Sequence, residues 1–590
     1  TMTWEYANAE HGNIALTGEI DISESGDFVL ALGFGRTPSE AANSARSSML
    51  DGFESAKKWY TEEWEKWLGK LSDVNGKYFR TSAAVLRMNE AKTFPGGIIA
   101  SLSIPWGQSK GDNDMGGYHL VWPRDLVESA GGFIALQTND DTLRIVNYLM
   151  STQNADGSWP QNMWLTGEAY WKGVQMDQTA LPLVLMEKCN RHQALDKDRM
   201  ARYWPLIKKA ISYLIINGPY TQQDRWEEEK GFSPFTVAAE IAGLLAAADL
   251  AEVNNEEEIA NYCRETADYW NDNIETWTYV AGTSLAKETG VDGYYIRINP
   301  YYTIPASELG DKYINLKNHK DGEGKTLLNE LICVDALALV RFGLRPANDP
   351  KILNTVKVID AKLKVETPNG PCWHRYNNDG YGEDSQGNPY NGTGIGRAWP
   401  LLTGERGHYE IAAGNVDEAG NLLKAMEAFT NNGLLPEQIW DTNDIPEKNL
   451  YFGKPSGSAM PLTWAHAEYI KLSASVKDKE VFDMPPQTQK RYLKQKTTSS
   501  YNIWRFNNQF TTTSRHKKLR IEVLTNAMIQ WSDDDWQTTK ETWTKDTGLG
   551  VFAAGIEIES KNSNQIIFTF FWSEANHWEN KNFTIKIEGD

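Results

Sequence analysis

The sequence predicts a mainly α protein built around an (α/α)6 barrel, a closed ring of six helical hairpins. Twelve segments between residues 75 and 477 carry the apolar spacing of helices. The connections between these segments alternate between long and short. Strand-like patterns lie outside this region, in residues 1–36 and 501–590. The barrel is therefore expected to be flanked by the tail of an N-terminal β-sandwich and by a C-terminal β-sandwich-like domain.

The first 36 residues contain two short β-rich stretches, "NIALTGEI" and "FVLALGFG", separated by a polar turn. Two strands form only a marginal sheet by themselves. We therefore expect residues 1–36 to be the C-terminal part of a β-sandwich. The remainder of that domain is expected in an N-terminal segment of the same protein missing from this chain, or in another chain.

A helical linker is predicted over residues 37–72. Thr37 can cap the helix, Pro38 suits its first position, and Glu40 completes a capping box. The apolar and charged residues that follow are compatible with one helix that continues to about Leu68. A helix of this length beside a β-domain is typical of an interdomain connection.

The predicted barrel domain covers residues 73–478. Its long connections lead into the even-numbered helices and are rich in Gly, Trp, Tyr and acidic residues, so one end of the barrel is expected to carry the chemistry. The twelve predicted helices cover residues 75–91, 123–138, 140–153, 176–191, 199–217, 235–253, 256–279, 329–343, 350–364, 397–414, 417–430 and 459–477.

The composition changes after residue 478. Residues 479–500 are charged and contain prolines, which indicates a linker. Stretches such as "KLRIEVL" and "NQIIFTFFW" then have the length and apolar pattern of strands, which predicts a C-terminal β-domain over residues 501–590. Trp531, Trp536, Trp572 and Trp578 of this domain could form an exposed ligand-binding face, or could pack in its core and against the barrel.

Charge and cysteine content exclude several classes of protein. The net charge of −20 argues against nucleic acid and anionic membrane surfaces as partners. The sequence shows no evident signal peptide and no obvious membrane span, so a soluble chain of undetermined compartment is expected. The cysteines form no CxxC pair and no metal-ligand cluster is evident, so we expect free thiols, no metal and no cofactor. These four residues are Cys189, Cys263, Cys333 and Cys372.

The long connections carry polar and aromatic motifs that could hold a sugar. Carboxylates and arginines form paired hydrogen bonds with neighbouring hydroxyls, while aromatic rings pack on the apolar faces of sugar rings. The barrel would bring these distant segments to one rim. The motifs are "GGYHLVWPRDL", "WKGVQMDQTAL", "TQQDRWEEEKGFSP", "YNGTGIGRAWP" and "NGLLPEQIWD".

The chain resembles bacterial glucoamylase-type and glucodextranase-like proteins of glycoside hydrolase family 15 over roughly residues 10–478. The similarity is carried by "WPRDL", "QQDRWEEEKGFSP", "RYNNDGYGE", "GRAWPLLTGERGHYE" and "LLPEQIWD", in that order. The resemblance implies an N-terminal β-sandwich, a helical linker and an (α/α)6 catalytic domain. It also implies hydrolysis of α-glucosides from the non-reducing end with inversion, which requires one protonated and one ionised carboxyl group. For such a polysaccharide substrate, a secreted or periplasmic location is favoured.

The match to the family implies that Glu227 is the general acid and Glu437 the general base. Trp226 precedes Glu227 directly, and an apolar neighbour raises the pKa of a carboxyl group because it disfavours the anion. Repulsion from Glu228 and Asp224 is expected to act in the same direction. The resemblance also implies that Glu228 helps to bind the sugar on the leaving-group side.

A solvated loop charge is the simplest interpretation of Glu229. The family match further implies that Arg124 and Asp125 grip the hydroxyls of the terminal glucose and that Trp171 packs near the catalytic acid. Arg397 matches a substrate-binding arginine, with Trp399 as an aromatic alternative at that position. The full predicted binding set is Tyr118, Trp122, Arg124, Asp125, Trp171, Trp226, Glu228, Arg397 and Trp399.

Several functions remain open on the sequence. An α-1,4-acting glucoamylase competes with an α-1,6-acting glucodextranase or isomaltose-type glucohydrolase, because both would use the same acid and base. A non-catalytic carbohydrate-binding protein would be expected to lack one carboxylate, yet Glu227 and Glu437 are both present. Among other (α/α)6 enzymes, a trehalase remains an alternative, whereas a polysaccharide lyase would favour Tyr, His or Arg as its base.

Overall fold

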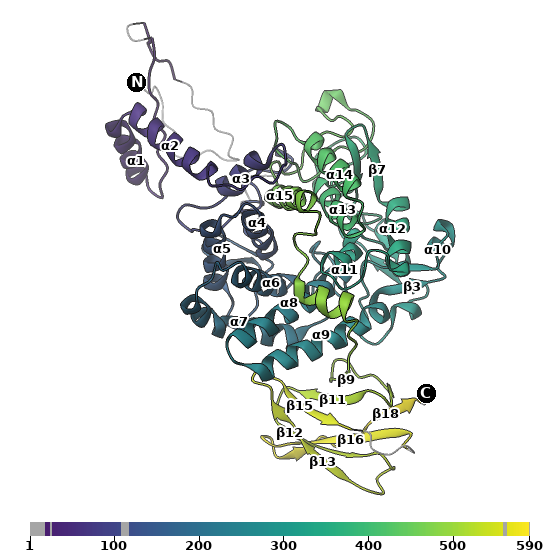
Figure 1. The fold of residues 1–590 in the computed structure, drawn as a ribbon. Coiled ribbons are helices and arrows are strands. Elements are labelled where there is room, and N and C mark those ends of the chain that lie inside the picture. The colour runs from purple at the N-terminus through teal and green to yellow at the C-terminus, as the bar shows by residue number, and fades with distance from the viewer. Residues whose placement is uncertain (1–17, 24–25, 108–116, 558–562, 589–590) are drawn as a thin grey trace.

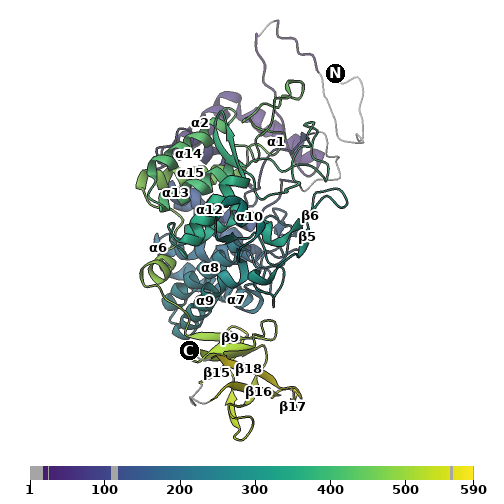
Figure 2. The same ribbon diagram turned by 90° about the vertical axis from the view of Figure 1, so that its right-hand side faces the viewer.

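The computed structural model describes residues 18–23, 26–107, 117–557 and 563–588. A barrel of helices forms the centre of the molecule. A pair of helices, α1 (Pro38–Asp51) and α2 (Phe53–Leu68), lies on one side of this barrel. A β-domain that begins at Tyr501 lies on another side, against its outer helices (Figures 1 and 2).

Six inner helices form a closed ring, in which each packs against the next and the last returns to the first. Their faces are largely buried, as expected for helices enclosed on all sides. The ring consists of α4 (Pro123–Ala135), α6 (Asp177–Arg191), α8 (Pro234–Val253), α11 (Ala338–Arg341), α13 (Pro400–Ala412) and α15 (Thr463–Asp478).

An outer layer of helices completes six hairpins with this ring, which confirms the predicted (α/α)6 barrel. The connection from each outer helix to the following inner helix is long, and the connection back to the next outer helix is short. The outer helices are α3 (Phe79–Met88), α5 (Asn139–Thr152), α7 (Lys197–Asn217), α9 (Glu257–Thr278), α12 (Pro350–Lys362) and α14 (Val416–Phe429).

One predicted helix is much shorter than expected. Residues 329–343 form the 3₁₀ turns η3 (Leu328–Glu330) and η4 (Val334–Leu337) and then only one turn of helix, α11. The backbone between the two 3₁₀ turns is extended, because it bonds to other segments: Arg297 donates to the carbonyl of Leu331, and Val334 donates to the carbonyl of Arg375. These long-range bonds replace the local ones that a helix requires.

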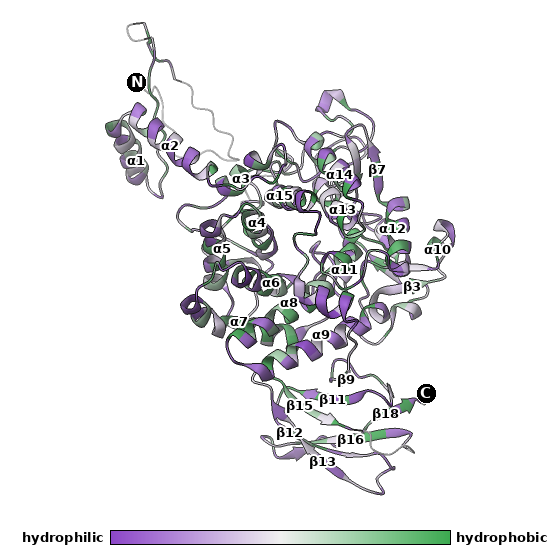
Figure 3. Cartoon of the chain, in the orientation of Figure 1, coloured by the Kyte–Doolittle hydropathy of each residue, from purple (hydrophilic) through white to green (hydrophobic). Residues whose placement is uncertain are grey.

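Helix α8 is the most apolar inner helix (Figure 3). Among the described residues it alone is long and apolar enough to cross a membrane, which corrects the expectation that no segment has this property. Nearly all of its residues are buried between α6 and α9, as in the core helix of a globular domain.

The inner helices begin at the end of the barrel where the long connections lie. Proline occupies the first helical position of α4, α8 and α13, where its missing N–H costs no hydrogen bond. Trp122 and Trp399 directly precede two of these helices, so their indoles are held at the rim. Because helix N-termini carry partial positive charge, this end of the barrel is suited to carboxylate groups.

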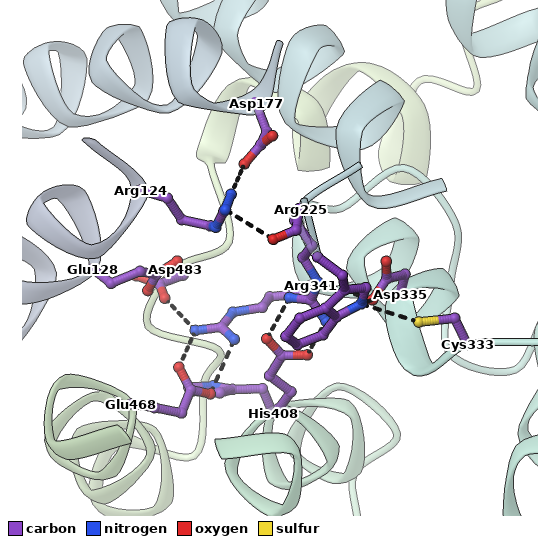
Figure 4. Close-up of polar contacts among 12 residues, drawn as sticks. Arg124, Glu128, Asp177, Arg225, Cys333, Asp335, Arg341, His408, Glu468 and Asp483 are labelled. Atoms are coloured by element: carbon purple, nitrogen blue, oxygen red, sulfur yellow. Dashed lines mark hydrogen bonds and ion pairs between the residues drawn. The ribbon is translucent and has the colours of Figure 1, made fainter. Parts of the chain in front are cut away.

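The opposite end of the ring is closed by a buried charge network. Arg341 pairs with Glu468 at 2.8 Å and with Asp483 at 2.6 Å (Figure 4). Lys471 contacts the same two acids and Glu128, so its ammonium group lies among the three carboxylates of this cluster. Asp483 belongs to the segment predicted as a linker, which therefore packs closely against the barrel.

The N-terminal segment differs from the prediction in two ways. The linker helix is divided, because Gly52 has a φ of 81° and ends α1 before α2 begins. Residues 28–35 form no strand in the described part of the chain, and Leu32 and Phe34 are largely exposed. A strand needs a hydrogen-bonded neighbour, and none of the described residues provides one. Residues 13–17 of the first predicted strand lie outside the described ranges.

The β-domain consists of two sheets around one apolar core. The inner sheet has the order β14-β15-β11-β9, and the outer sheet has the order β10-β18-β16-β12-β13, with β17 paired to β16. The strands are β9 (Tyr501–Trp504), β10 (Thr512–Ser514), β11 (Lys518–Val523), β12 (Ala527–Ser532), β13 (Lys540–Trp543), β14 (Lys545–Asp546), β15 (Phe552–Ile556), β16 (Gln565–Trp572), β17 (His577–Trp578) and β18 (Phe583–Glu588).

The inner sheet docks on the outer helix α9. The hydroxyl of Tyr262 donates to Glu522 at 2.8 Å, and Arg520 pairs with Glu265 at 2.7 Å. On α7, Ser212 donates to the carbonyl of Leu549 at 2.6 Å. Polar bonds from two helices therefore hold the β-domain in one orientation, with its outer sheet on the side away from the barrel (Figure 1).

Candidate active site

A cavity of about 400 Å³ lies at the rim where the inner helices begin. The long connections supply most of its wall, so residues far apart in the sequence meet there. Every predicted site residue except Arg397 lines it. The lining residues include Tyr118, Trp122, Arg124, Asp125, Trp171, Trp226, Glu227, Glu228, Trp399 and Glu437, together with Lys317, Asn318, Arg375, Tyr381, Tyr390 and Trp464, to which no role was assigned.

The carboxyl group of Glu227 is held on both of its oxygens. The indole of Trp122 donates to Oε1, and the side-chain amide of Gln161 donates to Oε2 at 2.7 Å. The backbone of Glu227 has a φ of 68°, a left-handed conformation that is uncommon and costly for a residue with a side chain. A tight turn from Asp224, whose carbonyl accepts from the N–H of Glu227 at 2.9 Å, accompanies this conformation. The fold therefore directs this carboxyl group into the cavity.

Burial raises the pKa of Glu227 above the ordinary range, while Arg124 and the bonds from Trp122 and Gln161 oppose the shift. The expected repulsion from Glu228 and Asp224 is not among the main causes. Arg297 binds both of these acids, at 3.1 Å and 2.6 Å, and so compensates their charge. Desolvation, rather than the neighbouring acids, favours the protonated form of Glu227.

Glu228 is part of a buried polar network at the cavity wall. Its carboxylate accepts from the hydroxyl of Tyr376 at 2.6 Å and from the amide of Asn318 at 3.2 Å, besides its pair with Arg297. The prediction that Glu228 contacts sugar stays a prediction. Glu229 is half-buried rather than fully solvated, and burial raises its pKa to about 7.

Gly231 ends the acidic turn at a position that excludes other residues. Its φ is 150°, and a Cβ atom there would lie 2.4 Å from the carbonyl oxygen of Asn299. This close approach lets Phe232 pair with Asn299 before α8 begins. The turn that carries Glu227 is thus anchored to the long connection after α9.

Glu437 has a different environment. The hydroxyl of Tyr118 donates to its Oε1, and the hydroxyl of Tyr381 lies 2.7 Å from that of Tyr118. Oε2 is buried and has no hydrogen-bond partner among the described residues. Burial raises the pKa of Glu437 to about 7, opposed by the bond from Tyr118 and by the charge of Arg375. Glu437 thus lines the cavity with one of its carboxyl oxygens left without a partner among the described residues.

Arg124 and Asp125 lie side by side at the start of α4, but they are not paired with each other. The guanidinium of Arg124 binds Asp177 at 3.0 Å and the carbonyl of Arg225 at 2.9 Å (Figure 4), and it also binds Gln175 at 2.7 Å. Asp125 lines the cavity, and burial raises its pKa to about 7. The Asp125 carboxyl group therefore remains available to a ligand.

Aromatic rings form much of the remaining wall. Trp226 stacks on Trp464 with ring centroids 6.1 Å apart and meets Trp399 edge-on at 5.5 Å. The indole N–H of Trp226 donates to Asp335 at 3.2 Å, which fixes the orientation of its ring. Trp171, by contrast, remains 47% exposed, so it can cover a ligand without being locked in the core.

The structure does not place Arg397 in the cavity. Its guanidinium is fully buried, pairs with Asp441 at 2.9 Å and donates to the carbonyls of Glu383 and Asp384 at 2.8 Å. Three acceptors therefore occupy the group that was predicted to bind substrate. Arg375 lines the cavity instead, and its guanidinium lies 5.1 Å from the ring of Trp226 and 5.4 Å from that of Trp399.

Sequence reasoning missed Arg375, Tyr381 and Gln161. The first two lie within "RYNNDGYGE", a stretch that carried the family resemblance, so the motif marked them although no role followed from it. Gln161 lies in "SWPQN", inside a long connection of the kind that lines the rim. Only its distance to Glu227 distinguishes it from other loop glutamines.

Two carboxyl groups in one aromatic-walled cavity on an (α/α)6 barrel are an arrangement expected of a glycoside hydrolase. The chain belongs to the glycosyl hydrolases family 15, whose model matches residues 74–474. A model of glucodextranase domain N matches residues 1–69, which supports the assignment of the N-terminal segment to such a domain.

Individual relatives agree with this family. The chain is 42% identical over 502 residues to a glucoamylase of Clostridium sp. (strain G0005), which covers 83% of this chain and 66% of the relative. It is 26% identical over 416 residues to an uncharacterized glycosyl hydrolase of Methanocaldococcus jannaschii, covering 68% of this chain and 56% of the relative.

Among solved structures, a bacterial glucoamylase complexed with acarbose superposes with a TM-score of 0.70 at 43% identity. The superposition covers 78% of this chain and 64% of that one. The chain thus spans slightly less than two thirds of the length of the glucoamylases that it matches.

Proposed function

We propose that this protein is an inverting, exo-acting α-glucosidase that releases β-glucose from the non-reducing ends of α-glucans, with preference for α-1,4 linkages. The observation that carries the proposal is the unlike surroundings of Glu227 and Glu437 in one cavity. The first has a donor on each oxygen, whereas the second keeps a buried oxygen without a protein partner. Inversion requires this division of roles between two carboxyl groups.

Glu227 acts as the general acid. Burial favours its protonated form, so it can give a proton to the glycosidic oxygen as the bond to the anomeric carbon breaks. The bonds from Trp122 and Gln161 then stabilise the carboxylate that remains. The same bonds keep the carboxyl group in one orientation during the step.

Glu437 acts as the general base. Its free Oε2 takes a proton from a water molecule, and that water attacks the anomeric carbon on the face opposite the leaving group. The hydroxyl of Tyr118 on Oε1 and the charge of Arg375 favour the ionised form that the base needs. The two carboxyl groups of an inverting enzyme lie about 6.5–9.5 Å apart, which leaves room for this water.

Arg124 and Asp125 account for exo action in this proposal. Both are buried at the start of α4, where their polar groups can bind the hydroxyls of a terminal sugar. Nε of Arg124 is buried without a partner among the described residues. A chain end that satisfied these groups would place its first glycosidic bond between Glu227 and Glu437.

The preference for α-1,4 linkages rests on the glucoamylase relative that is 42% identical. An α-1,6-specific glucodextranase is the second candidate, since the glucodextranase domain N model matches residues 1–69. That match lies outside the barrel, and the cavity is built by the barrel, so the first candidate has the stronger support. A non-catalytic carbohydrate-binding protein is disfavoured because both carboxyl groups are in place.

A hydrolysis panel tests the proposal. Maltose, isomaltose, maltotriose, trehalose and dextran are incubated with the protein, and the anomer of the released glucose is recorded by NMR before mutarotation. The proposal predicts β-glucose, fastest from maltotriose or maltose. Release of α-glucose would contradict inversion, and preference for isomaltose or dextran would establish the second candidate.

A further inference from the structure

A row of apolar side chains crosses the outer sheet of the β-domain. The strand registers pair Trp543 on β13 with Met528 on β12, Met528 with Phe571 on β16, and Phe571 with Trp578 on β17. Residues directly opposite each other in a sheet project from the same face. These four side chains therefore form one continuous row over four strands, named here the aromatic row.

The aromatic row lies on the face opposite the core of the β-domain. Alternate residues of the same strands, such as Ile529, Trp531, Phe568 and Phe570, belong to the core, whereas no member of the row does. Trp543 is 54% exposed and Trp578 is 37% exposed, whereas Phe571 is half-buried and Met528 is buried. The registers thus distinguish two tryptophans whose roles the sequence left open. Trp531 is directed into the core of the β-domain, and Trp578 is directed away from it.

A polar row runs beside the aromatic one. The next register positions on the same face pair Glu541 with Gln530 and Gln530 with Thr569. The amide of Gln530 donates weakly to Glu541, at 3.5 Å, and retains further capacity for hydrogen bonds. The face therefore offers flat apolar rings next to a carboxylate and an amide, whereas Thr569 is buried and its hydroxyl donates to the carbonyl of Lys581 at 2.8 Å.

This combination matches a neutral carbohydrate chain. Sugar rings present apolar C–H faces to aromatic side chains and hydroxyl groups to a polar edge. Strands lie about 4.8 Å apart, so a row over four strands extends about 14 Å, which is enough for a short oligosaccharide. The polar row contains an acid and no base, and the chain carries a net charge of −20, so an anionic ligand is disfavoured.

We infer that Trp543, Phe571 and Trp578 of the aromatic row form a non-catalytic binding surface for an α-glucan chain. The choice of α-glucan rests on the proposed function of the barrel. The β-domain is docked firmly on α7 and α9, so a polymer bound to the row stays near the barrel, and the local concentration of chain ends rises. The surface would therefore matter for insoluble or long substrates and not for maltose.

Binding to insoluble starch tests the inference, with the full chain depleted from solution at low temperature to limit hydrolysis. The double variant Trp543→Ala/Trp578→Ala should bind on the order of tenfold more weakly, since two ring contacts are lost. Its kcat/KM on maltose should equal that of the unchanged protein. Trp59→Ala, which removes a tryptophan that is 64% exposed on α2, is the matched control.

A second variant separates binding from folding. Trp543→Phe/Trp578→Phe keeps flat rings at both positions and should retain most of the starch binding. Near-unchanged starch binding by the alanine variant would overturn the inference. The inference would also be overturned if the alanine variant lost a concentration-dependent dimer but kept its starch binding. The face would then contact a second copy of the chain.

The two proposals can fail separately. Absence of hydrolysis in the panel, together with starch binding that depends on Trp543 and Trp578, would refute the proposed function and leave the binding surface in place. Hydrolysis of maltose, together with starch binding that does not depend on either tryptophan, would support the proposed function and refute the binding surface.

Discussion

The side-chain amide of Gln161 lies 2.7 Å from Oε2 of Glu227, on the opposite carboxylate oxygen from the indole of Trp122. This donor stabilises the anion and lowers the pKa of Glu227, the proposed general acid. A protonated acid is required for turnover, so kcat/KM falls as the pH rises through that pKa. Gln161 therefore helps to set the alkaline limb of the pH profile.

Gln161→Leu should move the alkaline limb to higher pH, because the pKa of Glu227 rises when a donor to its anion is lost. The rate at the optimum should fall about 10- to 100-fold, since the carboxyl group is less well oriented. Complete pH profiles of kcat/KM on maltose measure both effects. Gln222→Leu, at an exposed glutamine of the connection that carries Glu227, is the control. An unmoved alkaline limb with a normal rate would show that the bond has no role in catalysis.

Tyr118→Phe should move the acidic limb to higher pH. Glu437, the proposed base, must be ionised, and the hydroxyl of Tyr118 opposes the rise of its pKa to about 7. Without that donor the pKa of Glu437 rises, so protonation inactivates the enzyme at a higher pH. The same pH profiles apply, with Tyr451→Phe at a partly exposed tyrosine as the control. A shift toward lower pH would contradict the assignment of the base.

Glu227→Gln and Glu437→Gln should respond differently to the leaving group. Each should lose about 10²–10⁴-fold on maltose, because general acid or general base assistance is absent. Fluoride leaves without protonation, so Glu227→Gln should keep much more of its activity on α-glucosyl fluoride. Glu437→Gln should remain inactive on both substrates while still binding them. Equal losses of the two variants on the fluoride would refute the assigned roles.

Asp125→Ala should weaken both affinity and turnover. A charge-assisted hydrogen bond contributes roughly 1.5–3 kcal/mol, and binding of the terminal sugar also aligns the reacting bond. The kcat/KM on maltose should therefore fall at least about tenfold, whereas Asp140→Ala at an exposed aspartate should have no effect.

The products of a long α-glucan test the same anchor in the unchanged protein. Glucose as the sole early product supports a closed pocket at Asp125. Early maltotetraose or longer fragments would indicate an open cleft, and the anchoring role of Arg124 and Asp125 would then be wrong.

Glu240→Gln should stabilise the protein above about pH 5. Glu240 is fully buried on α8, neither of its carboxyl oxygens has a partner among the described residues, and burial raises its pKa well above the ordinary value. The folded protein therefore holds a proton that the unfolded chain releases above about pH 4.3. Stability from this group is fully present below that pH and is lost as pH rises toward the folded pKa, by about 1.4 kcal/mol per pH unit.

Urea unfolding between pH 4.5 and 7.5 measures this effect. The difference in stability between Glu240→Gln and the unchanged protein should grow with pH. Glu258→Gln, at an exposed glutamate of α9, should show no such trend. A difference that is independent of pH would mean that Glu240 is ionised in the folded state.

The sequence by itself determined the barrel and its chemical end. Helical periodicity and the alternation of long and short connections are local properties, so six hairpins followed from them without knowledge of distant contacts. The same connections contained Glu227 and Glu437, whose motifs were specific enough to carry a family resemblance. Departures such as the break at Gly52 arose where one residue changed the backbone direction.

Only the tertiary structure decided which side chains reach the cavity and which are neutralised elsewhere. Arg397 and Arg375 have the same chemistry in the sequence, and each is paired with an aspartate, Asp441 and Asp379 respectively. Only Arg375 lines the cavity. Likewise, strand register separated Trp531 in the core from Trp578 on the surface. These outcomes depend on partners far away along the chain, because burial and ion pairing are set by contacts in space that local sequence patterns do not encode.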